Sequence, residues 1–329
     1  MKVLITGVAG LLGANFSRHL LSKGYKVVGI DDLSGGYEES VPRDVTFYKQ
    51  DLVNRKAIDG IFNKEKPDYV FHFAAYAAEG LSPFIRNYNY TNNVLASANV
   101  INACINNDVK KVIFTSSMAV YGIGDPPFTE EQLPTPEDPY GIAKYAVEMD
   151  LKLAHEMFGL KYSIVRPHNV VGLYQNIWDR YRNVIGIWIR KALNNEPLSI
   201  FGDGTQVRAF SDIKYYMEPF EKLMTSHDSE IFNIGANKYY TINEAADAVI
   251  TVAKELGINA TKVHLEKRNE VHTAYCDHTK AHKLLGFNDD TNLHDMIMKM
   301  FKWAQEQPER PMKTMEYEIE KNMYSFWKK

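Results

Sequence analysis

The stretch KVLITGVAGLLG, residues 2–13, decides the fold of this chain. It predicts a strand, a glycine-rich turn and the start of a helix over Leu11–Ser22. The turn contains Gly7, Gly10 and Gly13, spaced G-x-x-G-x-x-G. Such glycines permit positive φ and close backbone approach, while the helix N-terminus offers free N–H groups to a pyrophosphate. Glycines also simply make turns, so the pattern needs support from the rest of the chain.

Strands and helices alternate outward from this stretch over the first two-thirds of the sequence. The predicted strands are Val3–Thr6, Lys26–Ile30, Val45–Tyr48, Tyr69–Phe73, Lys111–Thr115 and Tyr162–Val165. The predicted helices between them include Leu11–Ser22, Asn54–Lys64, Thr91–Asn106 and Ile142–Phe158. The alternation predicts an α/β fold with a Rossmann-type, doubly wound parallel sheet covered by helices on both faces.

The pattern changes near residue 168, where Gly and Asn become more frequent. We expect residues 1–168 to form the Rossmann domain and residues 169–329 to form mainly a smaller α/β substrate lobe, with the chain crossing between the lobes more than once. The run Thr241–Glu244 is a capping-box signature and predicts a helix start there. The last eighteen residues, Met312–Lys329, are expected to form a peripheral helix without chemistry.

Composition and charge exclude several classes of protein. The chain has 329 residues, of which 45% are hydrophobic and 24% charged, as in ordinary globular proteins. Its 38 basic and 41 acidic side chains give a net charge of −3, which provides no basic field for nucleic acid. No apolar run approaches the ~18–20 residues of a membrane span. Cys104 and Cys276 fit no metal or redox spacing. We therefore expect a cytoplasmic protein with reduced thiols and no metal site.

Acidic residues follow two of the predicted strands. Asp31 ends the second strand eighteen residues after Gly13, where a carboxylate can bind both hydroxyls of an adenosine ribose. Its negative charge would repel a 2′-phosphate, which favours NAD over NADP as the cofactor. Asp32 follows directly, and Asp51-Leu52 ends the third strand, where an acidic side chain can meet the adenine amino group. The alternative for all three aspartates is turn formation at strand ends.

A phenol and an ammonium, Tyr140 and Lys144, stand at i and i+4 on one face of a predicted helix. A tyrosine with a pKa near ~10 is a poor base at neutral pH, but a nearby lysine and a cationic nicotinamide ring would lower that pKa. Upstream, a buried strand runs into Ser116-Ser117, and Ser117 could hydrogen-bond the reacting oxygen and share its proton with Tyr140. The alternatives are a salt-bridged surface helix with a packed tyrosine, and serines that only cap a strand end.

Together these residues resemble the extended short-chain dehydrogenase/reductase family, and within it the NAD-dependent nucleotide-sugar epimerases of the UDP-glucose 4-epimerase type. The resemblance rests on the glycine turn, Asp31, His72-Phe73-Ala74-Ala75, Ser116-Ser117 and Tyr140-x-x-x-Lys144, and runs from Met1 to about Phe287. It implies NAD as cofactor, a UDP-sugar as substrate, and a homodimer formed through the helices Thr91–Asn106 and Ile142–Phe158.

The residues and the resemblance together assign the site. Cofactor binding is predicted for Gly7, Gly10, Leu11, Leu12, Gly13, Asp31, Asp32, Asp51, Leu52, Phe73, Ala74, Ala75, Asn93, Ser116, Tyr140 and Lys144. Catalysis is predicted for Tyr140, Lys144 and Ser117, and substrate binding for Ser117, Asn169, Arg208, Arg268 and Ala274. The two arginines match elements that bind the nucleotide diphosphate, with a surface ion pair as the alternative. The stretch Glu79–Ser82 could touch the sugar.

Two departures from the family pattern affect the substrate side. Arg208 is followed by Ala209 where many relatives have Asp. The segment from Arg268 to Val271 is shorter than the usual Arg-Pro-Gly-Asp-Val of the family. Ala274 matches a position that borders the C2 substituent of the sugar, where a small residue accompanies acceptance of N-acetylhexosamines. If the match to the family is shifted by one residue, Tyr275 borders the C2 substituent of the sugar instead.

Several nicotinamide chemistries are compatible with this resemblance. Sugar 4,6-dehydratases of the family carry Asp-Glu after a Thr that matches Ser117, and UDP-glucuronate decarboxylases resemble a pattern with Glu at the Ala119 position. Here Met118 and Ala119 cannot donate a proton. NADPH-dependent reductases would favour a small or basic residue in place of Asp31. The remaining reaction is epimerisation, in which C4 is oxidised, the ketone turns, and the hydride returns to the opposite face. A different sugar-modifying enzyme of the family and a non-catalytic NAD-binding regulator or scaffold stay open.

Overall fold

The computed structural model describes residues 1–268 and 270–328. Its centre is a seven-stranded parallel sheet in the order β11-β6-β5-β4-β1-β2-β3. The strands are β1 (Lys2–Thr6), β2 (Lys26–Asp31), β3 (Thr46–Lys49), β4 (Tyr69–His72), β5 (Lys111–Thr115), β6 (Tyr162–Pro167) and β11 (Glu230–Ile234). The predicted doubly wound sheet is confirmed. The strand order reverses between β1 and β4, and ligands bind at the carboxyl ends of the strands beside such a point.

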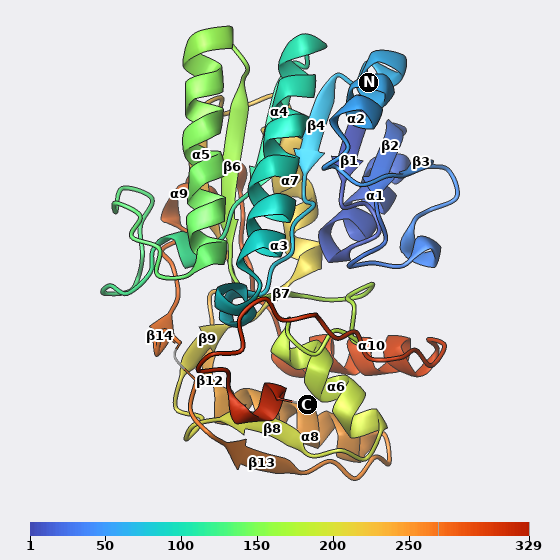
Figure 1. Cartoon of the computed structure of the whole chain (residues 1–329). Helices are drawn as coiled ribbons and strands as arrows, with labels where there is room; N and C mark the ends of the chain where they lie inside the picture. Colours follow the sequence, from blue (N-terminus) through green and yellow to red (C-terminus); the bar gives the residue numbers. More distant parts are fainter. Residues whose placement is uncertain (269, 329) are drawn as a thin grey trace.

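Helices cover both faces of the sheet (Figure 1). One face carries α2 (Arg55–Glu65), α4 (Ala96–Asn106) and α5 (Pro139–Phe158), with α3 (Arg86–Tyr90) leading into α4 through the turn Thr91–Leu95. The other face carries α1 (Leu11–Ser22), α7 (Met217–Leu223) and α9 (Thr279–Leu285), and its core includes Phe16, Phe71 and Phe220. Because β11, α7 and α9 follow residue 168, the chain returns to the sheet after it first leaves it.

A second lobe lies beyond the carboxyl ends of the strands (Figure 1). Its helices are α6 (Val184–Leu193), α8 (Ile242–Glu255) and α10 (Leu293–Gln305), which share a separate apolar core. Its short strands are β7 (Val170–Val171), β8 (Leu198–Phe201), β9 (Val207–Ala209), β10 (Ser211–Asp212), β12 (Tyr239–Thr241), β13 (Lys262–Leu265) and β14 (Thr273–Ala274). The predicted capping box is confirmed, because the Thr241 side chain accepts from the Glu244 N–H while the Glu244 carboxylate accepts from the Thr241 N–H.

Local sequence fixes both ends of α5, the helix that carries Tyr140 and Lys144. The Asp138 carboxylate caps its first turn by accepting from the N–H groups of Tyr140 and Gly141 at 2.9 and 3.1 Å. Pro139 stands in that first turn, where its missing N–H costs no helical hydrogen bond. The helix ends at Gly159, which takes the left-handed conformation with φ of 73°. Tyr140 is thereby placed in the first turn of the helix, at the carboxyl edge of the sheet.

The expectation of a peripheral helix for the C-terminal residues is wrong. After α10 the described residues, up to Lys328, run between the lobes without an α-helix and include one short 3-10 turn, η6 (Ser325–Trp327) (Figure 1). The ammonium of Lys313 contacts the carbonyl oxygen of Ser34, and the Trp327 ring packs against Phe84 at 5.8 Å between centroids. Met323 and Trp327 of this segment are buried in a separate apolar cluster with residues of the 3-10 turn Glu79–Phe84, and other aromatic side chains of the segment pack against that cluster. Tertiary packing therefore overrides the local pattern.

A buried histidine at the end of β4 connects the sheet to α4. His72 Nδ1 lies 2.7 Å from the hydroxyl of Thr6, and its Nε2 lies 2.8 Å from the hydroxyl of Ser97. Burial, and next the charge of Lys144, lower the pKa of His72 to about 3. The folded state therefore holds this imidazole neutral at pH values where an unfolded chain would protonate it.

We expect the stability of the protein to fall as the pH drops below about 6.5, the ordinary pKa of histidine. The contribution of His72 is complete above that pH and is lost progressively toward the folded pKa of about 3. At pH 4.5 the loss from this one residue is about 2.5 kcal/mol. Urea unfolding of wild type and of His72→Gln at pH 7.5 and 4.5 measures it, because the variant loses less stability between the two pH values. Equal losses in the two proteins would contradict the assignment.

Candidate active site

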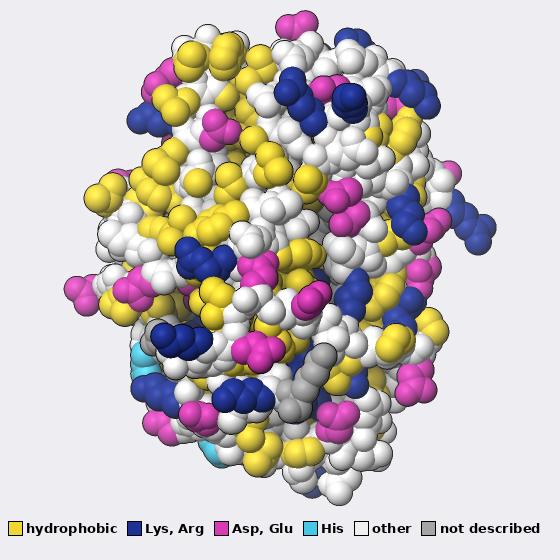
Figure 2. All heavy atoms as spheres, viewed as in Figure 1, with side chains coloured by type: hydrophobic (Ala, Val, Ile, Leu, Met, Phe, Trp, Pro, Cys, Tyr) yellow, Lys and Arg dark blue, Asp and Glu magenta, His cyan; other side chains and the backbone are white. Residues whose placement is uncertain are grey.

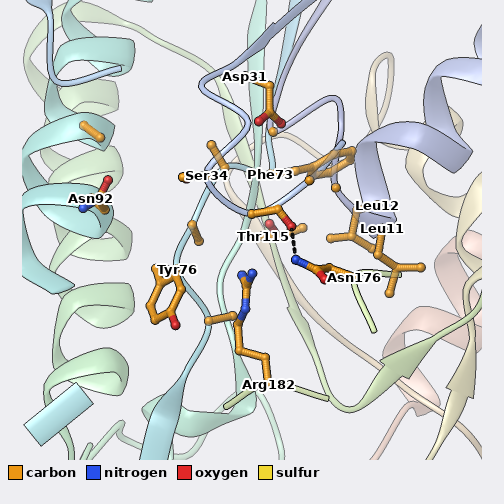
Figure 3. Close-up of a pocket in the computed structure, with 18 of the residues that line it drawn as sticks. Leu11, Leu12, Asp31, Ser34, Phe73, Tyr76, Asn92, Thr115, Asn176 and Arg182 are labelled. Carbon is orange, nitrogen blue, oxygen red and sulfur yellow. Dashed lines mark hydrogen bonds between the residues drawn. The ribbon is translucent and has the colours of Figure 1, made fainter. Parts of the chain in front are cut away.

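A cavity of about 380 Å³ lies at the carboxyl ends of the strands, between the sheet and the second lobe (Figure 3). Most residues predicted for the site line it. From the predicted set these are Gly7, Gly10, Leu11, Leu12, Asp31, Asp32, Asp51, Leu52, Phe73, Ala74, Ala75, Ser116, Ser117, Tyr140, Lys144 and Asn169. The wall does not include Gly13, Asn93, Arg208, Arg268 or Ala274. Strand ends far apart in sequence thus converge on one cleft.

Two positions of the glycine turn admit only glycine. A Cβ on Gly7, whose φ is 71°, would lie 2.8 Å from the backbone nitrogen of Ala74. A Cβ on Gly13 would lie 2.3 Å from the carbonyl oxygen of Gly7. Gly13 thus allows the turn to pack on the helix, and does not line the cavity itself. Gly10 precedes α1 without any side-chain cap, which leaves the helix N–H groups available to a phosphate.

Asp31 is a buried carboxylate with two fixed donors. Its Oδ2 accepts from the N–H of Ala9 at 2.9 Å, and its Oδ1 accepts from the N–H of Leu33 at 2.8 Å. Burial raises its pKa, and these two hydrogen bonds oppose the rise. The acceptor capacity that remains is available to ribose hydroxyl groups. Asp32 accepts a hydrogen bond from the N–H of Ser34, and Asp51 accepts one from the N–H of Val53, so both form the strand-end turns given as the alternative. Both also line the cavity.

Tyr140, Lys144 and Ser117 come together as predicted from the sequence. The Tyr140 hydroxyl hydrogen-bonds with Ser117, and the Lys144 Nζ lies 5.8 Å from the centre of the Tyr140 ring. Lys144 donates a 2.8 Å hydrogen bond to the carbonyl oxygen of Thr115. The neighbouring Ser116 hydroxyl is buried without a partner among the residues that the structure describes. These polar groups surround a space that a reacting hydroxyl could enter.

The protein alone does not lower the pKa of Tyr140. Burial raises it, and the hydrogen bond from Ser117 opposes the rise only in part. Burial also lowers the pKa of Lys144 to about 7. The expected lowering of the Tyr140 pKa therefore depends on further positive charge, which a bound nicotinamide ring supplies.

Arg208 and Arg268 lie beside the cavity and share one carboxylate. Their guanidinium groups lie 3.4 and 3.2 Å from Glu270 Oε2. Arg208 also donates to the backbone carbonyls of Val207, Val271 and His272. The ion pair weighed as the alternative is therefore present, which does not exclude a diphosphate from the same guanidinium groups.

Two further predicted residues lie behind the cavity wall. Ala274 pairs with Arg208 across β14 and β9 and is 6% exposed. The Asn93 side chain is buried and bonds both backbone groups of Tyr76, at 2.9 Å to the N–H and 3.2 Å to the carbonyl oxygen. Asn93 thereby holds the Tyr76 segment at the cavity edge.

Sequence reasoning missed Arg182, whose side chain projects into the cavity between Tyr76 and Asn176 (Figure 3). Its Nε donates to the buried Asp179 at 2.8 Å, and its Cζ lies 4.7 Å from the centre of the Tyr76 ring. A Cβ on Gly35 would lie 3.2 Å from its Nη2, so the guanidinium reaches the loop after Asp31. Within residues 1–268 and 270–328, Nη1 and Nη2 have no hydrogen-bond acceptor, so the guanidinium could hold an anion. No sequence motif predicts that Arg182 lines the cavity.

The residues fit NAD. The uncapped start of α1 suits a pyrophosphate, the Asp31 oxygens suit the adenosine ribose hydroxyls, and Ser116 lines the cavity together with Ser117 and Tyr140. Lys144 and Tyr140 line the same cavity, as the predicted contact with the nicotinamide ribose requires. Tyr140 then stands where it can exchange a proton with a substrate hydroxyl beside the ring.

Comparisons with known proteins identify the family of the chain. Residues 3–235 match the model of the NAD dependent epimerase/dehydratase family. A putative UDP-glucose 4-epimerase of Methanocaldococcus jannaschii is 31% identical over 92% of this chain and 97% of its own. The crystal structure of UDP-glucose 4-epimerase with UDP-glucose from Thermotoga maritima is 30% identical with a TM-score of 0.86, covering 93% of this chain and 99% of its own.

Other solved structures of similar fold are named for different sugars. The UDP-N-acetylglucosamine 4-epimerase of Methanobrevibacter ruminantium is 31% identical with a TM-score of 0.84, over 92% of this chain and 98% of its own. The UDP-glucuronic acid 4-epimerase of Bacillus cereus, in complex with UDP-glucuronic acid and NAD, is 26% identical with a TM-score of 0.83, over 93% of this chain and 99% of its own.

The chain belongs to the NAD dependent epimerase/dehydratase family, which is part of the extended short-chain dehydrogenase/reductases. Within that family it is an NAD-dependent nucleotide-sugar 4-epimerase. Among the residues that the structure describes, no helix combines the length and apolarity needed to cross a bilayer.

Proposed function

We propose that the enzyme inverts C4 of a UDP-hexose, interconverting UDP-glucose and UDP-galactose and also their N-acetylated forms, through a transient 4-keto sugar. The observation that carries the proposal is the hydrogen-bonded pair of Tyr140 and Ser117, with Lys144 beneath it, on one wall of the cavity. Relatives and structural neighbours named for UDP-glucose and UDP-N-acetylglucosamine support the choice of substrate.

Tyr140 acts as the base in this reaction. Its phenolate takes the proton of the 4-hydroxyl group, while Ser117 holds the same oxygen and relays the proton. Lys144 binds the nicotinamide ribose, and its charge favours the phenolate form of Tyr140. NAD, when bound, supplies the hydride acceptor and donor for C4. The proton that Tyr140 holds then returns to the sugar oxygen when the alcohol is formed again.

The surroundings of Ser117 favour epimerisation over loss of water or carbon dioxide. The next residues, Met118 and Ala119, have no proton to donate, whereas elimination needs an acid there. Arg208 and Arg268 hold the UDP diphosphate, which anchors the nucleotide and leaves the hexose free to turn. The Glu270 carboxylate that both arginines share in the structure then moves aside for the phosphate oxygens.

Incubation of the purified protein with UDP-glucose, followed by ¹H NMR of the anomeric protons, tests the proposal. UDP-galactose should accumulate to a fixed equilibrium ratio without added NAD. A 4-keto-6-deoxy sugar as the product would favour a dehydratase instead. Absence of any sugar conversion, with NAD bound, would favour a regulator or scaffold.

NAD is expected to copurify with the protein, because an epimerase uses no net cofactor. If NADH were released, the 4-keto intermediate could not be reduced again. Asp31→Ala removes the carboxylate proposed to hold the adenosine ribose, so the variant should retain about tenfold less NAD after gel filtration. NAD released by heat and measured enzymatically gives the occupancy. Asp44→Ala, at an exposed loop position outside the cavity, is the control and should retain normal occupancy. Wild type that is free of cofactor and prefers NADP would contradict the role of Asp31.

A homodimer and a cytoplasmic location are further parts of the proposal. Apolar side chains lie exposed along α5, and Figure 2 shows hydrophobic side chains gathered over the upper left of the molecule, where Figure 1 places this helix. The exposed members are Ile142, Met149, Leu153, Met157 and Phe158. Such a face supports pairing of α4 and α5 with their copies in a second chain. We also propose the division into a Rossmann domain, residues 1–168, and a mainly substrate-binding lobe, residues 169–329.

A further inference from the structure

Glu79 is an acidic residue on the sugar side of the cavity. It begins the 3-10 turn Glu79–Phe84 and lines the same cavity as Tyr140, with its side chain open to that space. The other acidic residues of the wall, Asp31, Asp32 and Asp51, lie at the adenosine end. The chemistry of the reaction described above makes no use of Glu79.

A serine fixes the backbone of Glu79 relative to the catalytic tyrosine. The Ser82 hydroxyl lies 2.8 Å from the carbonyl oxygen of Glu79 and 3.1 Å from Oδ1 of Asp138, the residue that caps α5. The same hydroxyl accepts a hydrogen bond from the Tyr140 N–H at 3.2 Å. The turn that carries Glu79 and the helix that carries Tyr140 are therefore joined through one side chain.

The carboxylate of Glu79 has no hydrogen bond or ion pair with the part of the chain that the structure describes, residues 1–268 and 270–328. The charged and titratable groups that act on it are Tyr140, Asp138, Arg208, Glu270 and Arg268. This group therefore contains two guanidinium groups, Arg208 and Arg268, and three carboxylates, Glu79, Asp138 and Glu270. Both guanidinium groups already form ion pairs with Glu270. When they hold a diphosphate, no cation of this group remains to neutralise Glu79.

The position between Tyr140 and the two arginines is the place of the hexose. In the proposed complex Tyr140 acts on the 4-hydroxyl group and the arginines hold the diphosphate at C1. Glu79 lines the cavity with Tyr140 and is joined to the Tyr140 backbone through Ser82, so it lies near the sugar. The cavity walls remove part of the water around Glu79 although its side chain stays accessible, and this desolvation, and next the charge of Asp138, raise its pKa to about 7. The protein therefore already disfavours negative charge here, and a second carboxylate from the substrate would add to that penalty.

We propose that Glu79 is a specificity-determining residue, which accepts a hydrogen bond from a hydroxyl group of a neutral hexose and rejects hexuronates such as UDP-glucuronate. This inference rests on the proposed function, because it assumes that the nucleotide sugar binds between Tyr140 and the arginines. It separates this enzyme from relatives of the same fold that are named for UDP-glucuronic acid. Like charges at close range in a cleft that water partly fills are sufficient for about 100-fold discrimination.

The test compares UDP-glucose and UDP-glucuronate at pH 8.5, where a carboxyl group with a pKa near 7 is ionised. Wild type should show a kcat/KM about 100-fold higher for UDP-glucose. Glu79→Gln keeps the shape of the side chain and removes its charge, and should reduce that ratio about tenfold or more, mainly by lowering the KM for UDP-glucuronate. Glu137→Gln removes an exposed carboxylate next to Asp138 and should leave the ratio unchanged.

A binding measurement separates failure of this inference from failure of the proposed function. Isothermal titration of the NAD-loaded proteins with each UDP-sugar gives the two dissociation constants without turnover. Glu79 has no such role if wild type converts UDP-glucose and UDP-glucuronate with equal kcat/KM. The same conclusion follows if Glu79→Gln changes neither the ratio of kcat/KM nor the ratio of dissociation constants for the two sugars. If neither sugar is converted, the proposed reaction fails, and the ratio of dissociation constants still decides the role of Glu79. NAD content and melting temperature confirm that each variant is folded.

Discussion

Tyr140→Phe is expected to lower turnover of UDP-glucose by about 10²–10⁴-fold while NAD stays bound. The substitution removes only the hydroxyl that bonds Ser117 and leaves the buried ring in place beneath the cavity. Because the base is lost and the binding surfaces are kept, kcat should fall and KM should change little. Initial rates over a range of UDP-glucose concentrations, with NAD occupancy measured on the same samples, give this result.

The neighbouring tyrosine supplies the matched control. Tyr145 stands one residue after Lys144 on α5 and does not line the cavity. It packs against a small buried cluster of Val120, Tyr121, Phe128 and Cys276. Tyr145→Phe also removes one phenolic hydroxyl from the helix, and its turnover should stay within about twofold of wild type. Full activity in Tyr140→Phe would show that another group takes the proton.

Ala274→Tyr is expected to abolish activity on UDP-N-acetylglucosamine, by about 100-fold or more, while activity on UDP-glucose changes by less than about threefold. The reason is volume, since a close-packed wall accommodates an acetamido group only where a large side chain is absent. In the structure Ala274 is buried beside Arg208 on the adjacent strand, close to the proposed diphosphate site but behind the cavity wall. Rates with both sugars, measured in parallel, give the ratio.

Tyr275 provides the comparison for the shifted register. Tyr275 follows directly after the end of β14, and its ring stacks on Tyr239 at 4.8 Å between centroids, so its side chain is engaged away from the cavity wall. Tyr275→Ala should therefore leave the ratio between the two sugars unchanged. If Ala274→Tyr reduces both activities equally, residue 274 does not border the C2 substituent. If Tyr275→Ala changes the ratio instead, the shifted register is the correct one.

The nucleotide half of the site could be predicted from sequence because its signals are local. Each glycine of the turn, and Asp31, stands at the end of a strand or the start of a helix, so spacing along the chain fixes their positions in space. The same holds for Tyr140 and Lys144, which one capped helix places on one face. The parallel order of the sheet then brings these strand ends to one edge.

The remaining features depend on contacts between distant segments. Arg182 reaches the cavity because Asp179 and the Tyr76 ring hold its guanidinium, and Tyr76 is in turn held by Asn93. No periodicity or motif relates these residues. The path of the C-terminal segment is likewise set by aromatic packing on Phe84, and its own sequence does not reveal that partner. Glu79 appeared in the sequence only as part of a stretch near the sugar, and its charged surroundings emerged from the fold.

Deuterium at C4 of the substrate tests oxidation and return of hydride at that carbon. In the proposed reaction the hydrogen of C4 leaves and returns to the same carbon within one site, while Tyr140 moves only the oxygen-bound proton. UDP-glucose carrying deuterium at C4, converted in ordinary water, should therefore give UDP-galactose that retains the deuterium at C4, as read by NMR. UDP-galactose with ordinary hydrogen at C4, or deuterium found at another carbon, would contradict oxidation and return at C4.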